Sequence, residues 1–147
     1  MAAVRRVDVV WEGDLASGSG RASASTSWMF RDLPVSWSAR TEAPGGKTSP
    51  EELLAAAHAS CYAMALSAGL GGAGTPPQRL AVSASVTFDK VEGGWKVTRS
   101  ELTVRGKVAG ANEEGFRKAA EAAKDGCPIS QALRGNVQLS VHATLER

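Results

Sequence analysis

The stretch Ser49–Leu70, SPEELLAAAHASCYAMALSAGL, predicts a long helix around which the rest of the chain is organised. Ser49 is a suitable N-cap, Pro50 fits the first helical position, and Glu52 follows the cap at the spacing of a capping box. Apolar residues then occupy nearly every side of the helix, so we expect it to be buried rather than to lie on the surface. Glycines within 69–72 are expected to end it.

The composition is that of an ordinary globular protein. The chain has 147 residues, of which 43% are hydrophobic and 22% are charged, so we expect a single domain, 1–147, with a hydrophobic core of its own. The net charge is only +2 and the chain has no dense run of Lys and Arg, which argues against a nucleic-acid partner.

The central stretch is also long enough to be weighed as a membrane span. The run Leu53–Leu70 is rich in alanine and contains His58, Ser60 and Ser67, which favours a core helix over a transmembrane helix. The first residues include a basic pair with no apolar run behind it, unlike a secretory signal peptide. We therefore expect no membrane partner and a cytoplasmic location. Two cysteines in that compartment are more often catalytic or redox-active than permanently bridged.

Alternating apolar residues predict strands on both sides of the central helix. The expected strands are 5–12, 35–40, 80–88, 95–108 and 137–145, while the small polar segment 17–27 is compatible with a strand or a loop. Further helices are expected over 112–124 and 127–133. This order is not the strict alternation of a parallel sheet, so we predict an α+β fold with mainly antiparallel sheets. One sheet from one chain cannot cover so apolar a helix, which favours a homodimer.

The two cysteines, Cys61 and Cys127, are too far apart in sequence to form a local motif. Both are compatible with buried, inert positions, because free cysteine behaves as a small hydrophobe. Cys127 precedes Pro128, a good first helical residue, so backbone N–H groups at a helix start are expected to favour its thiolate. Cys61 lies in mid-helix and needs a neighbouring cation if it is to act as a nucleophile.

A metal site is an alternative use of the same residues. His58 and Cys61 are three positions apart and share one helix face, which suits a pair of zinc ligands. A zinc ion needs two further ligands, and only Cys127, His142 and carboxylates are available to supply them.

Two motifs resemble the signature of the OsmC/Ohr family of thiol peroxidases. The first is Ser49–Cys61, SPEELLAAAHASC, and the second is 126–130, GCPIS. The segments Trp11–Asp14 and 88–91 are similar to the OsmC branch, osmotically inducible protein C, and the resemblance extends over essentially the whole chain.

The resemblance implies a role for each matching residue. Cys61 corresponds to the peroxidatic cysteine, Cys127 to the resolving cysteine, and Glu51 to the glutamate of the family's Pro-Glu motif. The family's arginine corresponds to Arg40 in the pattern of the OsmC branch, and Arg21 is the alternative that matches the other branch.

The implied reaction is the reduction of organic hydroperoxides, with weaker action on hydrogen peroxide. Arg40 would stabilise the Cys61 thiolate and polarise the peroxide, while Glu51 holds the guanidinium in a bidentate pair. Cys127 would then close a disulfide with the Cys61 sulfenic acid, and a dithiol such as a dihydrolipoyl group would reopen it. The resemblance implies neither a metal nor a flavin cofactor.

The resemblance also implies an intertwined homodimer of α+β subunits. Glu51 and Cys61 are ten helical residues apart, about 15 Å of rise, so one arginine cannot easily touch both along a straight helix. We therefore expect Glu51, together with Arg40, to reach Cys61 of the partner subunit.

Two other functions remain open at this stage. They are a non-catalytic dimer that binds a small molecule, and a metal-binding dimer that uses His58, Cys61 and Cys127. Aromatic residues that could line a substrate pocket are Trp28, Phe30, Trp37 and Tyr62.

Overall fold

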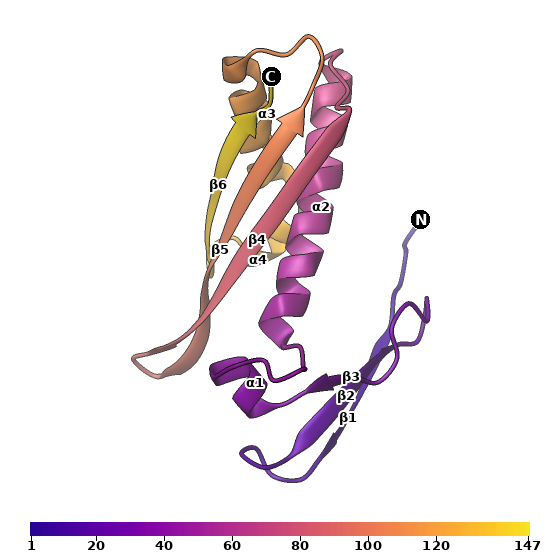
Figure 1. Ribbon diagram of the computed structural model, residues 1–147, viewed down its shortest axis with the longest axis vertical. Coiled ribbons are helices and arrows are strands. Elements are labelled where there is room, and N and C mark those ends of the chain that lie inside the picture. Colours follow the sequence, from indigo (N-terminus) through magenta and orange to yellow (C-terminus); the bar gives the residue numbers. More distant parts are fainter. The chain divides into compact units, whose positions relative to one another are not determined.

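A computed structural model describes residues 1–147 as two compact units, Met1–Leu53 and Leu54–Arg147. Each unit contains one three-stranded sheet, and helices complete the chain (Figure 1). The predicted α+β class is confirmed, whereas the expectation of a single domain stays a prediction.

The first unit is built on an antiparallel sheet of β1 (Val7–Glu12), β2 (Ser19–Ala24) and β3 (Leu33–Val35), so segment 17–27 contains a strand. Gly20 lies in the central strand, where a Cβ atom would come within 2.8 Å of the Trp11 ring and 2.9 Å of a Val35 methyl group. Only glycine allows these two side chains to close over the middle of the sheet.

The strand predicted over 35–40 is wrong beyond its first residue. Strand β3 ends at Val35, and a short helix, α1 (Trp37–Thr41), follows it. The side chain of Ser36 explains the difference, because its hydroxyl accepts a hydrogen bond from the Ala39 amide at 3.1 Å and caps the helix. A local cap of this kind overrides the strand preference of a short apolar run.

The central helix, α2 (Pro50–Gly72), begins where its sequence predicts. The Ser49 hydroxyl accepts from the Glu52 amide at 3.1 Å, which is the first half of a capping box. The prediction of a complete capping box is wrong. The Glu52 carboxylate accepts a hydrogen bond from the Thr48 hydroxyl at 2.6 Å instead of from the Ser49 backbone amide. Gly74, with φ of +85°, takes the left-handed conformation just beyond the helix.

The second unit contains a sheet of β4 (Arg79–Val91), β5 (Gly94–Lys107) and β6 (Gln138–Leu145). Strands β4 and β5 form an antiparallel hairpin, but β5 and β6 are parallel, because helices α3 (Glu113–Gly126) and α4 (Pro128–Leu133) form the crossover between them. The expectation of mainly antiparallel sheets therefore holds for every pair except this last one.

Helices α2 and α3 pack on the same face of this sheet and enclose the core of the second unit. Leu102, Val104 and Gly106 alternate along β5 on the buried face, and the residues between them are exposed. Gly106 is the contact point of α3, since a Cβ atom there would lie 2.5 Å from the ring of Phe116.

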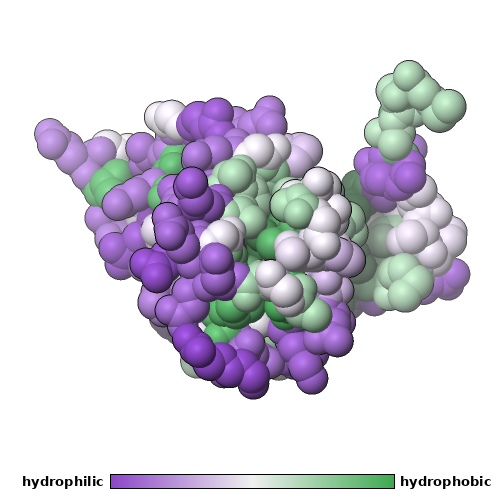
Figure 2. Space-filling model, turned by 90° about the horizontal axis from the view of Figure 1, so that it is seen from above, coloured by the Kyte–Doolittle hydropathy of each residue, from purple (hydrophilic) through white to green (hydrophobic).

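Helix α2 buries one stripe of side chains and leaves most of its apolar surface open. The buried stripe recurs at every fourth residue and consists of His58, Tyr62, Leu66 and Leu70. Met64, on the opposite side of the helix, is 73% exposed. Of the most apolar 18 residues of the helix, only 22% are buried. By length and composition alone, the helix could span a membrane. Figure 2 shows hydrophobic residues, in green, at the surface among hydrophilic residues in purple. One chain therefore covers only one side of the helix, as expected for a single sheet, and its full burial in a dimer stays a prediction.

Candidate active site

The two cysteines meet in the second unit. Cys61 lies in the middle of α2 and is half-buried, whereas Cys127 is the fully buried N-cap residue of α4, as the position of Pro128 predicts. Both are free thiols, and their sulfur atoms are 2.9 Å apart. This contact requires only a small movement to reach the bonding distance of a disulfide, which is about 2.05 Å.

The surroundings of the two sulfurs shift their pKa values in opposite directions. Burial raises the pKa of the Cys61 thiol, and its hydrogen bond with Cys127 raises it further against a smaller effect of the Ile129 amide. Burial also opposes ionisation of Cys127, but hydrogen bonds from Cys61, from Ser130 and from the Ile129 amide outweigh it and lower the pKa. Within this unit the start of α4 therefore favours a thiolate on Cys127.

A buried histidine connects the helix of Cys61 with the helix of Cys127. His58 is fully buried on α2, its Nδ1 lies 2.7 Å from the Ser100 hydroxyl, and its Nε2 lies 2.8 Å from the Ser130 hydroxyl. Either ring nitrogen can be the donor, depending on the tautomer. Burial lowers the pKa of His58, so the ring is held in its neutral form.

This network bears on the metal-site alternative. Both nitrogens of His58 already have hydroxyl partners, and no group of three His, Cys, Asp or Glu side chains in the chain is arranged to hold a metal ion. His58 stands out in the sequence, but Ser100 and Ser130, its partners, do not. The available signal was the histidine itself, because a polar ring inside an apolar helix needs buried partners for its nitrogens.

Arg40 and Glu51 form a bidentate ion pair in the first unit, as expected from the sequence. Nε of Arg40 donates to Oε1 and Oε2 of Glu51 at 3.0 and 3.1 Å, and Nη2 donates to Oε2 at 2.8 Å. The Glu51 side chain is 10% exposed and that of Arg40 is 29% exposed. The carboxylate is therefore largely committed to fixing the guanidinium, which still reaches solvent.

Arg40 contributes to the lining of an apolar cavity of about 180 Å³ in the first unit. Its lining residues are Trp11, Leu15, Val35, Ser36, Trp37, Arg40 and Pro50. Of the four expected pocket aromatics, Trp37 lies in this lining. Tyr62 is a core residue that donates a hydrogen bond to the Ala120 carbonyl at 2.9 Å, and Trp28 is 54% exposed.

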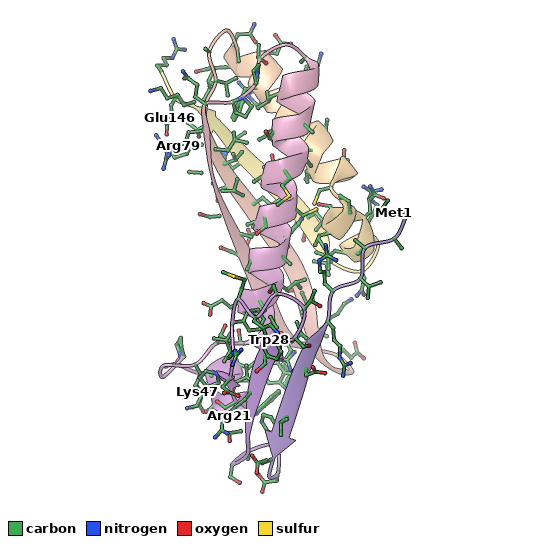
Figure 3. All side chains as sticks on the ribbon, turned by 90° about the vertical axis from the view of Figure 1, so that its right-hand side faces the viewer. Met1, Arg21, Trp28, Lys47, Arg79 and Glu146 are labelled. Atoms are coloured by element: carbon green, nitrogen blue, oxygen red, sulfur yellow. The ribbon has the colours of Figure 1, made fainter.

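Arg21, the alternative arginine, is in a different setting. It projects from the exposed side of β2 and lines a hollow of about 190 Å³ together with Asp8, Glu12 and Asp32 (Figure 3). This hollow is polar and acidic, in contrast to the apolar cavity beside Arg40.

Comparison with known proteins agrees with the resemblance in the two cysteine motifs. The family model for OsmC-like proteins matches residues 43–142. Peroxiredoxin OsmC of Escherichia coli strain K12 is 40% identical over 129 residues, which cover 88% of this chain and 89% of that protein.

Two further relatives extend the comparison. An organic hydroperoxide resistance protein of Xanthomonas axonopodis pv. citri (strain 306) is 27% identical over 128 residues, 86% of this chain and 88% of that one. The crystal structure of the organic hydroperoxide resistance protein OhrB of Bacillus subtilis matches with a TM-score of 0.73 and 26% identity, over 96% of this chain and 98% of that chain. The chain belongs to the family of OsmC-like proteins.

Proposed function

We propose that this protein is a cysteine-based peroxidase that reduces organic hydroperoxides through a Cys61 sulfenic acid and a Cys61–Cys127 disulfide. The observation that carries the proposal is the 2.9 Å separation of the two sulfurs. The names of the relatives, a peroxiredoxin and an organic hydroperoxide resistance protein, support the same activity.

In the first step the Cys61 thiolate attacks the terminal oxygen of R–O–OH. The O–O bond breaks, Cys61 becomes a sulfenic acid, and the alkoxide leaves as R–OH after taking up a proton. Burial alone disfavours the Cys61 thiolate, so a cation must act on it. We assign this role to Arg40, whose guanidinium Glu51 holds in a fixed orientation.

The homodimer is part of the same proposal. The open side of α2, with Met64 73% exposed, and the exposed valines of β1 are apolar surfaces that a second copy would cover. About 15 Å of helical rise lies between Glu51 and Cys61, so we propose that the Arg40–Glu51 pair acts on Cys61 of the partner subunit.

The apolar lining beside Arg40 supports an organic hydroperoxide as substrate, with hydrogen peroxide reduced more weakly. An external dithiol, such as a dihydrolipoyl group, would regenerate the two thiols by exchange. The proposed setting is the cytoplasm, where thiols are kept reduced.

The test is hydroperoxide consumption by reduced protein with cumene hydroperoxide and a dithiol. Cys61→Ser should abolish consumption, and Cys127→Ser should permit one oxidation per subunit but impair turnover. Ser60→Ala is the matched control, because Ser60 is the exposed neighbour of Cys61 and bonds only to the Ala56 carbonyl of its own helix. A reduced wild type that consumes no hydroperoxide would contradict the proposal.

The same assay ranks the reductants and substrates. Consumption should be faster with dihydrolipoamide than with the monothiol glutathione, and faster with cumene hydroperoxide than with hydrogen peroxide. Equal rates in both comparisons would contradict the proposed preferences for a dithiol reductant and for an organic hydroperoxide. The proposed peroxidase activity itself would still stand.

A further inference from the structure

Helix α4, which Cys127 caps, has few polar contacts with the rest of the protein. The helix spans only Pro128–Leu133, too short to be stable through its own hydrogen bonds. Its backbone groups and the side chains of Gln131 and Arg134 bond to groups within the same stretch of chain, residues 123–137. The position of α4 therefore depends on side chains that reach other elements.

Two side-chain contacts link this segment to α2. The sulfur of Cys127 lies 2.9 Å from the sulfur of Cys61. The hydroxyl of Ser130 forms a hydrogen bond of 2.8 Å with Nε2 of His58. The two residues on each side are three positions apart, about one helical turn, so the two contacts run next to each other.

The histidine contact is independent of the oxidation state of the sulfurs. Oxidation of Cys61 to a sulfenic acid would place an oxygen on its sulfur and remove the hydrogen bond between the two thiols. The bond between His58 and Ser130 uses neither sulfur, and both residues are fully buried. Breaking it would leave buried polar atoms without a partner, which is costly. This contact can therefore keep α4 beside α2 while Cys61 is oxidised.

We propose that His58 is a positioning residue, which holds Cys127 within reach of the oxidised Cys61 sulfur. It acts through its hydrogen bond to Ser130, which is joined to Cys127 by one helical turn. That turn is closed by the Gln131 amide, which donates to the Cys127 carbonyl at 3.0 Å. The inference rests on the proposed peroxidase function for its place in the reaction, and it adds a residue to the resolving step.

The expected effect is on closure of the disulfide. Without the bond between His58 and Ser130, α4 can move away from α2, and the effective concentration of the Cys127 thiol at Cys61 falls. The net contribution of one hydrogen bond corresponds to a change of roughly 3- to 10-fold in the equilibrium. Formation of the sulfenic acid does not involve α4 and should be unchanged.

The experiment measures the thiol–disulfide equilibrium of the full chain in mixtures of lipoamide and dihydrolipoamide. The thiols of Cys61 and Cys127 give two hydrogens to lipoamide, which becomes dihydrolipoamide as the protein S–S bond forms. Acid quenching, alkylation and intact mass spectrometry give the fraction of each form. We expect Ser130→Ala to lower the equilibrium constant for disulfide formation by roughly 3- to 10-fold, and an unchanged constant would overturn the inference.

Ser100→Ala is the matched control. It removes a hydroxyl that is as fully buried as that of Ser130 and bonds to the other nitrogen of the same ring, at 2.7 Å. Both substitutions should lower the midpoint of urea unfolding, since each leaves one nitrogen of His58 unpaired. Only Ser130→Ala should shift the redox equilibrium, because Ser100 lies on β5 and not on α4. Equal shifts in the two variants would show a general structural role and overturn the inference.

Two substitutions of His58 test the ring directly. The amide group of glutamine can take the position of Nε2, whereas that of asparagine reaches only the position of Nδ1. His58→Gln should therefore keep the redox equilibrium close to that of wild type, while His58→Asn should shift it as Ser130→Ala does. The opposite order of the two variants would contradict the assignment to Nε2.

A single turnover with one equivalent of cumene hydroperoxide tests the place of His58 in the reaction. In Ser130→Ala, sulfenic acid trapped by dimedone should form at the wild-type rate and persist roughly 3- to 10-fold longer. An unchanged lifetime would contradict a role in the resolving step. The redox equilibrium needs no peroxidase activity. If wild type consumes no hydroperoxide, the proposed function fails, and a redox shift in Ser130→Ala but not in Ser100→Ala would still establish positioning by His58.

Discussion

Cys61 and Cys127 are 66 positions apart in the sequence, and their sulfur atoms are 2.9 Å apart in the fold. The contact depends on α4 beginning immediately after Cys127 and on α2 presenting Cys61 beside the buried stripe of His58 and Tyr62. In the proposed reaction, proximity of this kind would make disulfide formation an intramolecular step and favour it over further oxidation by peroxide.

The first prediction concerns protection from overoxidation. Wild type treated with excess cumene hydroperoxide should lose both thiols and accumulate the intramolecular disulfide, whereas Cys127→Ser should accumulate sulfinic and sulfonic acid at Cys61. Intact mass spectrometry distinguishes the two, because the disulfide loses two hydrogens while the acids gain oxygen. Sulfinic acid formed at equal rates in both proteins would mean that Cys127 does not resolve the sulfenic acid.

The second prediction separates the two candidate arginines. Arg40→Lys keeps the charge but loses the bidentate pair with Glu51, so kcat/KM for cumene hydroperoxide should fall by roughly 10- to 100-fold. Arg21→Lys is the matched control on the acidic, exposed side of β2 and should retain the wild-type value. The reverse result would assign the role to Arg21.

The third prediction tests whether Glu51 acts by fixing Arg40. Glu51→Gln keeps the shape of the side chain and removes its charge, so the guanidinium should lose orientation and kcat/KM should fall by about tenfold. Glu52→Gln changes the exposed neighbour that bonds to Thr48 and should leave the steady-state kinetics unchanged. Equal effects of the two substitutions would indicate that only the negative charge near the start of α2 matters.

The positions of the elements were largely predictable, because the decisive signals are local. A cap, a proline and a glycine-bounded apolar run were enough to predict α2, and Pro128 was enough to predict the helix after Cys127. The strand expected over 35–40 failed because one serine hydroxyl, that of Ser36, decides between strand and helix there. The parallel pairing of β6 depends on the crossover through α3 and α4, which periodicity along a single strand does not reveal.

The site was predictable only in part, for a similar reason. The Arg40–Glu51 pair and the two cysteines follow from the motifs that the family shares. The partners of His58 do not, because Ser100 and Ser130 are 42 and 72 positions away from it and serine is common on any surface. Only the fold shows which two hydroxyls close on the ring.

The fourth prediction is the pH dependence of stability that His58 confers. Burial lowers its pKa in the native protein below the ordinary 6.5, so as the pH falls through about 6.5 the unfolded chain takes up a proton that the native protein does not. The free energy of unfolding should therefore decrease with falling pH, by at most about 1.4 kcal/mol per pH unit from this group. The contribution ends once the pH drops below the native pKa.

Urea unfolding of wild type and His58→Gln over this pH range checks the effect, and the slope should be shallower in the variant. His142→Gln replaces the exposed histidine of β6 and should follow wild type. A slope that is identical in all three proteins would show that carboxylates alone determine the acid sensitivity.

The fifth prediction uses two glycines as a matched pair. Gly106→Ala places a Cβ atom 2.5 Å from the Phe116 ring, so α3 must move off the sheet and the free energy of unfolding should fall by about 1–3 kcal/mol. Gly126→Ala, at the last residue of α3, meets no atom within 4 Å and should raise stability by up to about 1 kcal/mol through helix propensity. Thermal unfolding measures both changes. A Gly106→Ala variant as stable as wild type would mean that Phe116 does not pack against this position of β5 in solution.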